Sequence, residues 1–197
     1  MNERVTGNRR VVNGSEERNL YIFILRGLIA AALILTAAVL RILPHPWNFT
    51  PVGAMAIFSG SVLRKRWVAF VLPLVGLLAG DVFVGFYKLM FIVYASFALS
   101  VAIGRWLATS RSVARVGGAV LLGAVQFFVV TNFAMWAVGG FYPRTASGLT
   151  ACYITGFPLF RNTLAGDAVY ATVLFGGYAL AEKIFLRTEE NRAEARV

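Results

Sequence analysis

Six apolar runs, separated by short charged and polar stretches, divide most of the chain. They cover residues 22–40, 50–63, 67–87, 89–108, 117–139 and 163–181. Most of them are close to the ~20 residues that a helix needs to cross a bilayer. The second run is shorter, in the range typical of a buried or re-entrant segment. This pattern predicts an all-α integral membrane protein with six transmembrane helices, the second of them short.

Composition agrees with a membrane protein and indicates one domain. Hydrophobic residues make up 58% of the chain, and the mean hydropathy is +0.70. Soluble domains reach only about 45–50% apolar residues even when glycine is counted. We expect one transmembrane domain over residues 20–182, a disordered N-terminal tail over 1–19 and a C-terminal tail over 183–197. The single cysteine, Cys152, excludes an internal disulfide framework.

The distribution of positive charge predicts the topology. The net charge of +10 lies in short clusters between the apolar runs, so it forms no continuous basic face for nucleic acid. If the second run spans the membrane, 15 of the 19 Lys and Arg residues lie on the side of the N-terminus. If it does not, the split is 8 against 11. Because positive residues gather in cytoplasmic loops, we predict six spans with both termini in the cytoplasm.

Two aspartates interrupt apolar runs in the same local sequence, Leu-Ala-Gly-Asp. Asp81 lies in the third run and Asp167 in the sixth, which indicates a 3+3 inverted repeat of the kind seen in many transporters. On the six-span topology both acids and Asn132 lie about 8–10 Å below the outer surface. Carboxylates in a membrane usually face the bundle interior or a cavity. We therefore predict a solute cavity, with ion pairing of Asp81 to Lys88 and of Asp167 to Arg161 as the alternative.

Further donors, acceptors and rings are expected around this cavity. The proline-containing stretch before the second run offers several such donors, acceptors and rings. The carboxylates and the rings together favour a small, neutral or cationic, ring-bearing solute. The outer loop over residues 141–161 is aromatic and long enough to form a lid, or to lie on the lipid interface. The predicted solute-binding residues are His45, Trp47, Asn48, Thr50, Asp81, Asn132, Trp136, Asp167 and Tyr170. The predicted lid or rim residues are Tyr142, Arg144, Arg161 and Asn162.

Several of these stretches carry a family resemblance. HPWNFTPVGAMAIFSG, LPLVGLLAGD, TNFAMWAVGGFYP, GLTACY and FPLFRNTLAGD resemble a family of uncharacterised bacterial membrane proteins that are classed as transport proteins. That family in turn resembles the substrate-binding S components of energy-coupling-factor (ECF) vitamin transporters. The resemblance implies six spans, an outward-facing ligand site capped by loops, the bacterial inner membrane and an ATP-driven energising module as partner.

One feature of the first span departs from the resemblance. S components often carry Ala-x-x-x-Ala on this helix for docking the energising module. The chain instead has Gly27-x-x-x-Ala31 and Ala32-x-x-x-Thr36.

Three other functions fit parts of the pattern. A stand-alone proton- or ion-coupled transporter is open, because Asp81 and Asp167 could relay protons. An intramembrane aspartyl enzyme is disfavoured, since the sequence has no Tyr-Asp partner motif, and we expect no catalysis. A metal site from His45 and the two aspartates is chemically possible but loosely indicated. We expect no cofactor and no metal.

Overall fold

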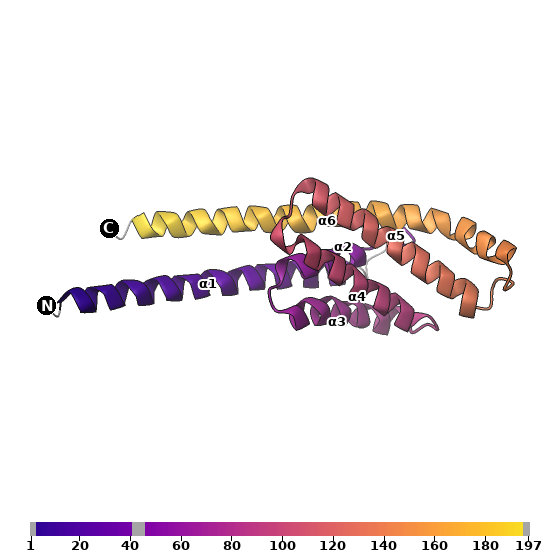
Figure 1. The fold of residues 1–197 in the computed structure, drawn as a ribbon, viewed down its shortest axis with the longest axis horizontal. Coiled ribbons are helices and arrows are strands. Elements are labelled where there is room, and N and C mark those ends of the chain that lie inside the picture. Colours follow the sequence, from indigo (N-terminus) through magenta and orange to yellow (C-terminus); the bar gives the residue numbers. More distant parts are fainter. Residues whose placement is uncertain (1–2, 41–45, 195–197) are drawn as a thin grey trace.

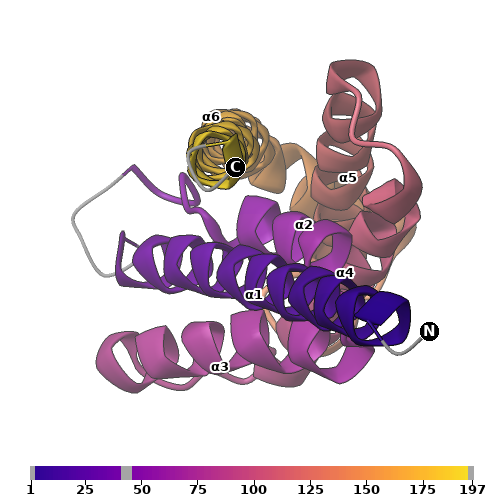
Figure 2. The ribbon, with the colours of Figure 1, turned by 90° about the vertical axis from the view of Figure 1, so that its left-hand side faces the viewer.

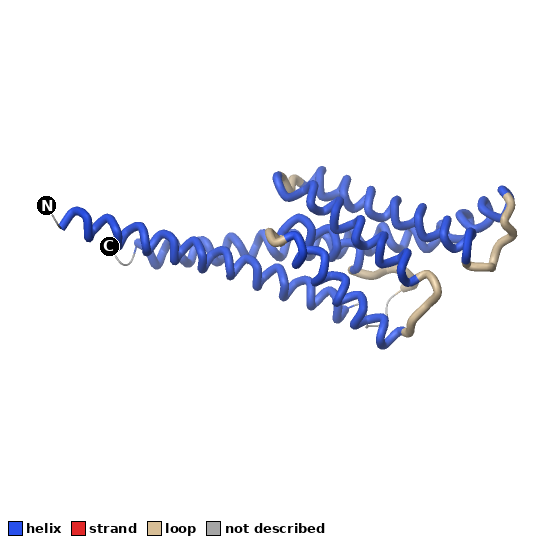
Figure 3. The backbone as a smooth tube through the Cα atoms, turned by 60° about the horizontal axis from the view of Figure 1, so that its bottom comes forward, coloured by secondary structure: helices blue, strands red, loops and turns tan. Residues whose placement is uncertain are grey.

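The structure is a computed structural model and describes residues 3–40 and 46–194, with side chains described over 20–40, 46–83 and 85–185. All regular structure within these ranges is helical (Figure 3). The elements are α1 (Glu3–Leu40), α2 (Val52–Val62), α3 (Arg66–Val84), α4 (Met90–Trp106), the short 3-10 helix η1 (Leu107–Thr109), α5 (Val113–Val138) and α6 (Ala146–Glu194).

Five of the described helices are long and apolar enough to cross a membrane. The candidate spans are Leu20–Leu40, Arg66–Phe83, Met90–Thr109, Val113–Val138 and Ala146–Phe185. Helix α2 has 11 residues. At 1.5 Å per residue it covers about 16 Å, roughly half of the hydrocarbon thickness. The prediction of an all-α membrane protein with a short second helix is confirmed.

Although α2 is short, it reverses the direction of the chain. Its first turn lies beside Asp167, and its last turn lies near Arg111. The side chain of Arg111 lines a cavity together with Arg26 of α1 and Glu182 of α6. Because α2 runs back through the bundle, the N- and C-termini lie at the same end of the molecule (Figure 1). We call this the terminal end, and the end with the α3–α4 and α5–α6 connections the far end.

Helix α2 forms the centre of the core. In the view from the terminal end it lies among the longer helices (Figure 2), and nine of its residues are buried. A Cβ atom at Gly60 would collide with the Val101 carbonyl of α4, and one at Gly104 would collide with the Ile57 carbonyl of α2. Glycine at both contact points therefore allows α2 and α4 to pack backbone against backbone, as is common in membrane bundles.

Helix α6 is much longer than the predicted sixth span. It begins at Ala146 and contains Pro158, so most of the predicted outer loop over 141–161 is helical and that part of the prediction is wrong. The threonine hydroxyls of this segment donate to carbonyls four residues earlier, as Thr155 does to Ala151 at 2.8 Å. Such bonds satisfy polar side chains inside a helix. The α5–α6 connection consequently lies beyond the α3–α4 connection at the far end (Figure 3).

Candidate functional site

The carboxylate of Asp167 caps the N-terminus of α2. It is buried, and its Oδ1 atom accepts a hydrogen bond of 2.8 Å from the backbone N–H of Ala54, while the N–H of Gly53 also donates to it. Pro51, the N-cap residue, supplies no side-chain hydrogen bond. The first N–H groups of a helix have no partner within the helix, and they form the positive end of its dipole. Asp167 therefore has a structural role that joins α6 to α2.

Two arginines satisfy the opposite end of α2. Arg105 donates from Nη1 to the Leu63 carbonyl at 2.7 Å, and Arg111 donates from Nη2 to the Ser61 carbonyl at 3.3 Å. Carbonyls of the last helical turn lack partners within the helix and carry its partial negative charge. A half-length helix inside a membrane protein thus has both of its ends covered by ionisable side chains from other parts of the chain: Asp167 of α6, Arg105 of α4 and Arg111 of the η1–α5 connection.

Asp81 is fully buried between α3 and α4. The Tyr94 hydroxyl donates to its Oδ2 atom at 2.9 Å. Lys88, the partner in the ion-pairing alternative, donates from Nζ to the Val138 carbonyl at the end of α5, at 2.8 Å. The contacts described for the two acids differ from the ion pairs of the alternative: Asp81 accepts a hydrogen bond from a tyrosine hydroxyl, and Asp167 accepts from backbone N–H groups.

The turn before α2 packs against α6. Asn162 donates from Nδ2 to the Trp47 carbonyl at 2.9 Å, and the Phe49 ring lies 5.9 Å from the Tyr170 ring. Asn48 adopts a positive φ of 59°, which asparagine tolerates better than most residues. The predicted residues of this stretch thus come together with α6, although the Trp47 side chain is largely exposed. His45 lies outside the described residues.

A cavity of about 220 Å³ lies at the far end between α4, α5, α6 and the Asn48 turn. Its volume corresponds to about seven water molecules at ~30 Å³ each. The described residues that line it are all uncharged. Five polar side chains border it, namely Asn48, Tyr87, Thr131, Asn132 and Thr163, together with the rings of Phe127, Phe128 and Phe160. This combination suits a small polar molecule with an apolar face.

The amide of Asn132 is held at the wall of this cavity. Its Nδ2 atom donates to the Phe128 carbonyl at 2.8 Å, and Gly156 of α6 faces its Oδ1 atom so closely that a Cβ atom there would collide with it. Gly156 precedes Asp167 by 11 residues on α6, or about 16 Å along a helix. Asn132 and Asp167 therefore do not share one depth, contrary to the prediction.

The remaining predicted residues lie around this region without lining the cavity. Trp136 donates from Nε1 to the Pro143 carbonyl at 2.9 Å and so ties the α5–α6 connection to α5. Tyr142 is partly buried, Arg144 and Arg161 are exposed, and Thr50 is partly buried next to Pro51. Among the residues described, no group of three His, Cys, Asp or Glu side chains could hold a metal ion.

Sequence reasoning missed several residues of the cavity and of the layer below it. Thr131 and Thr163 line the cavity. Each is adjacent in sequence to a predicted residue, Asn132 or Asn162, and this adjacency is the signal by which they could have been predicted. Deeper in the bundle, Gln126 donates from Nε2 to the Ser96 carbonyl and to the Ser100 hydroxyl, both at 3.0 Å. Its Oε1 atom and the Ser96 hydroxyl are buried without a described partner. Polar groups of this kind are usually hydrated.

Comparison with known proteins identifies the family. Residues 23–190 match a family of unknown function, DUF6580. The chain belongs to this family. No curated protein and no solved structure matches it. The matched region includes all the described helices except the first 20 residues of α1 and the last four of α6, so the α2 caps and the far-end cavity both lie within it.

Proposed function

We propose that this protein is a membrane-embedded solute-binding component of a transport system, and that its solute is small, polar and uncharged. The observation that carries the proposal is the far-end cavity, where amide and hydroxyl groups alternate with aromatic rings and no charged side chain is described. An ion entering such a site would find no compensating charge there, and burying it would be costly. The sequence alone had left a cationic solute open; the lining favours a neutral one.

The distribution of charge supports an outward-facing cavity. Of the 17 Lys and Arg residues within the described ranges, 14 belong to the terminal end, whereas Lys88 and Arg144 lie in the far-end connections and Arg161 lies in α6. The positive-inside rule then orients the terminal end toward the cytoplasm of the bacterial inner membrane. This arrangement resembles the S components of ECF transporters, which implies an ATP-driven energising module as partner. The 3+3 inverted repeat is part of the same proposal.

The contacts of the two aspartates favour this function over a proton-coupled transporter or an intramembrane enzyme. Asp167 accepts backbone hydrogen bonds at the start of α2, and Asp81 accepts one from Tyr94. Both carboxylates are buried, and neither lines the far-end cavity. A proton relay or a catalytic pair needs carboxylates that reach the solute or water pathway.

Native mass spectrometry of the mildly solubilised protein tests the proposal. We expect a bound small molecule in the wild-type protein and its loss in Ala124→Phe, because Ala124 is a buried residue of the cavity wall. Val125→Phe is the matched control, since the neighbouring Val125 is exposed on the outer surface of α5. Equal retention of the molecule by both variants, or no bound molecule from any membrane extract, would contradict solute binding in this cavity.

A further inference from the structure

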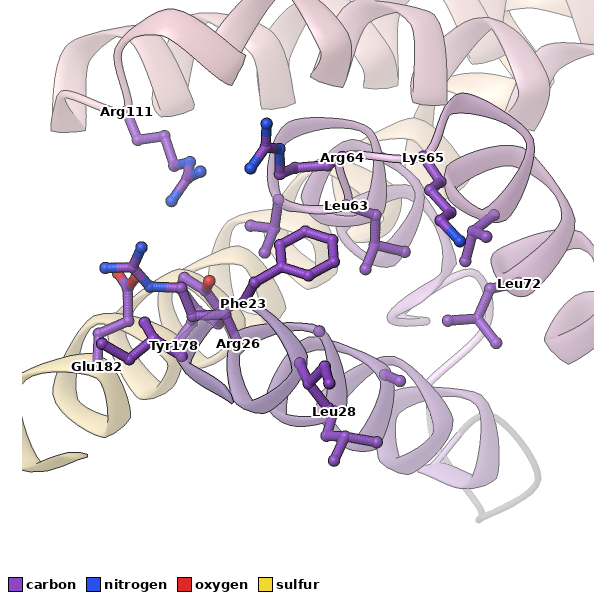
Figure 4. Close-up of a pocket in the computed structure, with 16 residues that line it drawn as sticks. Phe23, Arg26, Leu28, Leu63, Arg64, Lys65, Leu72, Arg111, Tyr178 and Glu182 are labelled. Atoms are coloured by element: carbon purple, nitrogen blue, oxygen red, sulfur yellow. The ribbon is translucent and has the colours of Figure 1, made fainter. Parts of the chain in front are cut away.

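A second and larger cavity, of about 610 Å³, lies at the terminal end (Figure 4). It is formed by α1, the α2–α3 connection, α3, α6 and Arg111 of the η1–α5 connection. Four basic residues and one acid belong to its described lining: Arg26, Arg64, Lys65, Arg111 and Glu182. The charge of the acid is already paired, because Glu182 forms an ion pair of 2.8 Å with Arg26. Subtracting this pair leaves three positive charges on the described wall.

The two remaining arginines are positioned by aromatic rings. The Arg64 guanidinium lies 5.3 Å from the centre of the Phe23 ring, and that of Arg111 lies 5.7 Å from the Tyr178 ring. A guanidinium stacked on a ring keeps donors in its plane for other partners. Figure 4 shows the heads of Arg64 and Arg111 turned toward each other across the cavity. Like charges facing each other in this way favour an anion between them.

The wall of the cavity along α1 is apolar. Ile24 and Leu28 line it and are 49% and 62% exposed, and Leu72 of α3 lies opposite. These residues belong to the spans Leu20–Leu40 and Arg66–Phe83. Exposed apolar side chains on a span contact acyl chains, which are as apolar as leucine. The cavity therefore offers cations at one side and a surface for hydrocarbon at the other.

We propose that this cavity binds an anionic phospholipid. Its phosphate would lie between Arg64, Lys65 and Arg111, and an acyl chain would lie along Ile24 and Leu28 of α1. A wall with one basic and one apolar side suits an amphiphilic ligand. A free phosphate ion would contact only the basic side, and a zwitterionic lipid would bring its own cation into a cluster that is already positive. Basic pockets between spans near the membrane surface bind such headgroups in general. The site is separate from the far-end cavity, so it does not depend on the proposed solute.

The test uses lipids with identical acyl chains and different headgroups. Delipidated full-length protein in detergent is titrated with phosphatidylglycerol, phosphatidylcholine or inorganic phosphate, and binding is followed by native mass spectrometry and thermal stability. We expect phosphatidylglycerol to bind at least about 10-fold more tightly than phosphatidylcholine, since each nearby basic residue contributes about 5-fold. Equal binding of the two lipids would overturn the proposal. Stabilisation by inorganic phosphate that equals that by phosphatidylglycerol would also overturn it.

Charge-neutralising variants locate the site. The double variant Arg64→Gln, Lys65→Gln should bind phosphatidylglycerol on the order of 30-fold more weakly. Arg66→Gln is the matched control, because Arg66 is the next residue along the chain, is also exposed and does not line the cavity. A loss for Arg66→Gln as large as that for the double variant would show general surface attraction rather than a site. Arg111 is left unchanged, since it also caps α2. The comparison of lipids on wild-type protein gives a result even if a variant folds poorly.

Discussion

The cap that Asp167 places on α2 gives a sharp prediction about stability. In Asp167→Ala the N–H groups of Gly53 and Ala54 would lose their acceptor, and Ala54 would remain buried in the bundle. Asp167→Asn keeps an oxygen that can accept from Ala54 but loses the charge and one acceptor atom. The matched control is Thr172→Ala, because Thr172 is exposed on the same helix and its hydroxyl bonds only to Ala168 of its own helix among the contacts described.

The expected magnitudes follow from the contacts. A hydrogen bond to a charged group contributes about 1.5–3 kcal/mol, and each buried donor left unpaired costs about 1–3 kcal/mol. We expect Asp167→Ala to lower the free energy of unfolding by about 3–5 kcal/mol. Asp167→Asn should lower it by only about 1 kcal/mol, because it also removes the desolvation cost of a buried charge. The control should change it by less than about 0.5 kcal/mol.

Reversible unfolding in mixed micelles with increasing SDS, followed by far-ultraviolet circular dichroism, measures these differences. A substitution on α2 tests the same contact independently. A methyl group at Gly53 would collide with the Asp167 carboxylate, so Gly53→Ala should displace the carboxylate and reproduce part of the loss in the free energy of unfolding. If Asp167→Ala were as stable as Thr172→Ala, the carboxylate would not support α2, and a role in solute or proton binding would return.

Three further predictions concern single substitutions, and the first two have matched control sites. Gly156→Ala should displace the Asn132 amide and abolish retention of the small molecule with little change in stability, whereas Gly176→Ala, which meets no neighbour within 4 Å, should retain it. Gly60→Ala should destabilise the fold by at least about 1–3 kcal/mol because a methyl group meets the α4 backbone; Gly118→Ala, with open space, should be neutral or stabilising. Ser147→Cys in a cysteine-free background should react with an impermeant maleimide in intact cells, and reaction only after permeabilisation would reverse the topology.

More of the fold than of the candidate site could be predicted from the sequence. The apolar runs located all the described helices except η1, and the second run was predicted to be short from its length. The prediction of a disordered tail over residues 1–19 is wrong from Glu3 onward, because α1 begins there. The start of α6 was missed because Gly156, Pro158 and the threonines of that segment resemble a loop in sequence. In the structure the hydroxyls of Thr155 and Thr163 bond to carbonyls of their own helix, so the segment presents little polarity to its surroundings.

The partners of the two aspartates could not be deduced from sequence. Burial inside the bundle was predicted correctly from the cost of an intramembrane charge, and both residues are buried. The acceptor role of Asp167, however, depends on Ala54, which lies 113 residues earlier in the chain. Backbone donors leave no sequence signal, since any residue other than proline supplies an N–H group. Side-chain patterns therefore indicated a ligand site where the structure has a helix cap.

The half-length of α2 also constrains the order in which the protein is built. A helix of 11 residues is too short to be released alone into a bilayer about 30 Å thick, where its ends would lack partners. The groups that cover those ends, Arg105, Arg111 and Asp167, are all synthesised later. We expect α2 to reach its final depth only after α6 has left the ribosome, so a chain truncated before Asp167 should keep residues 52–62 accessible to water.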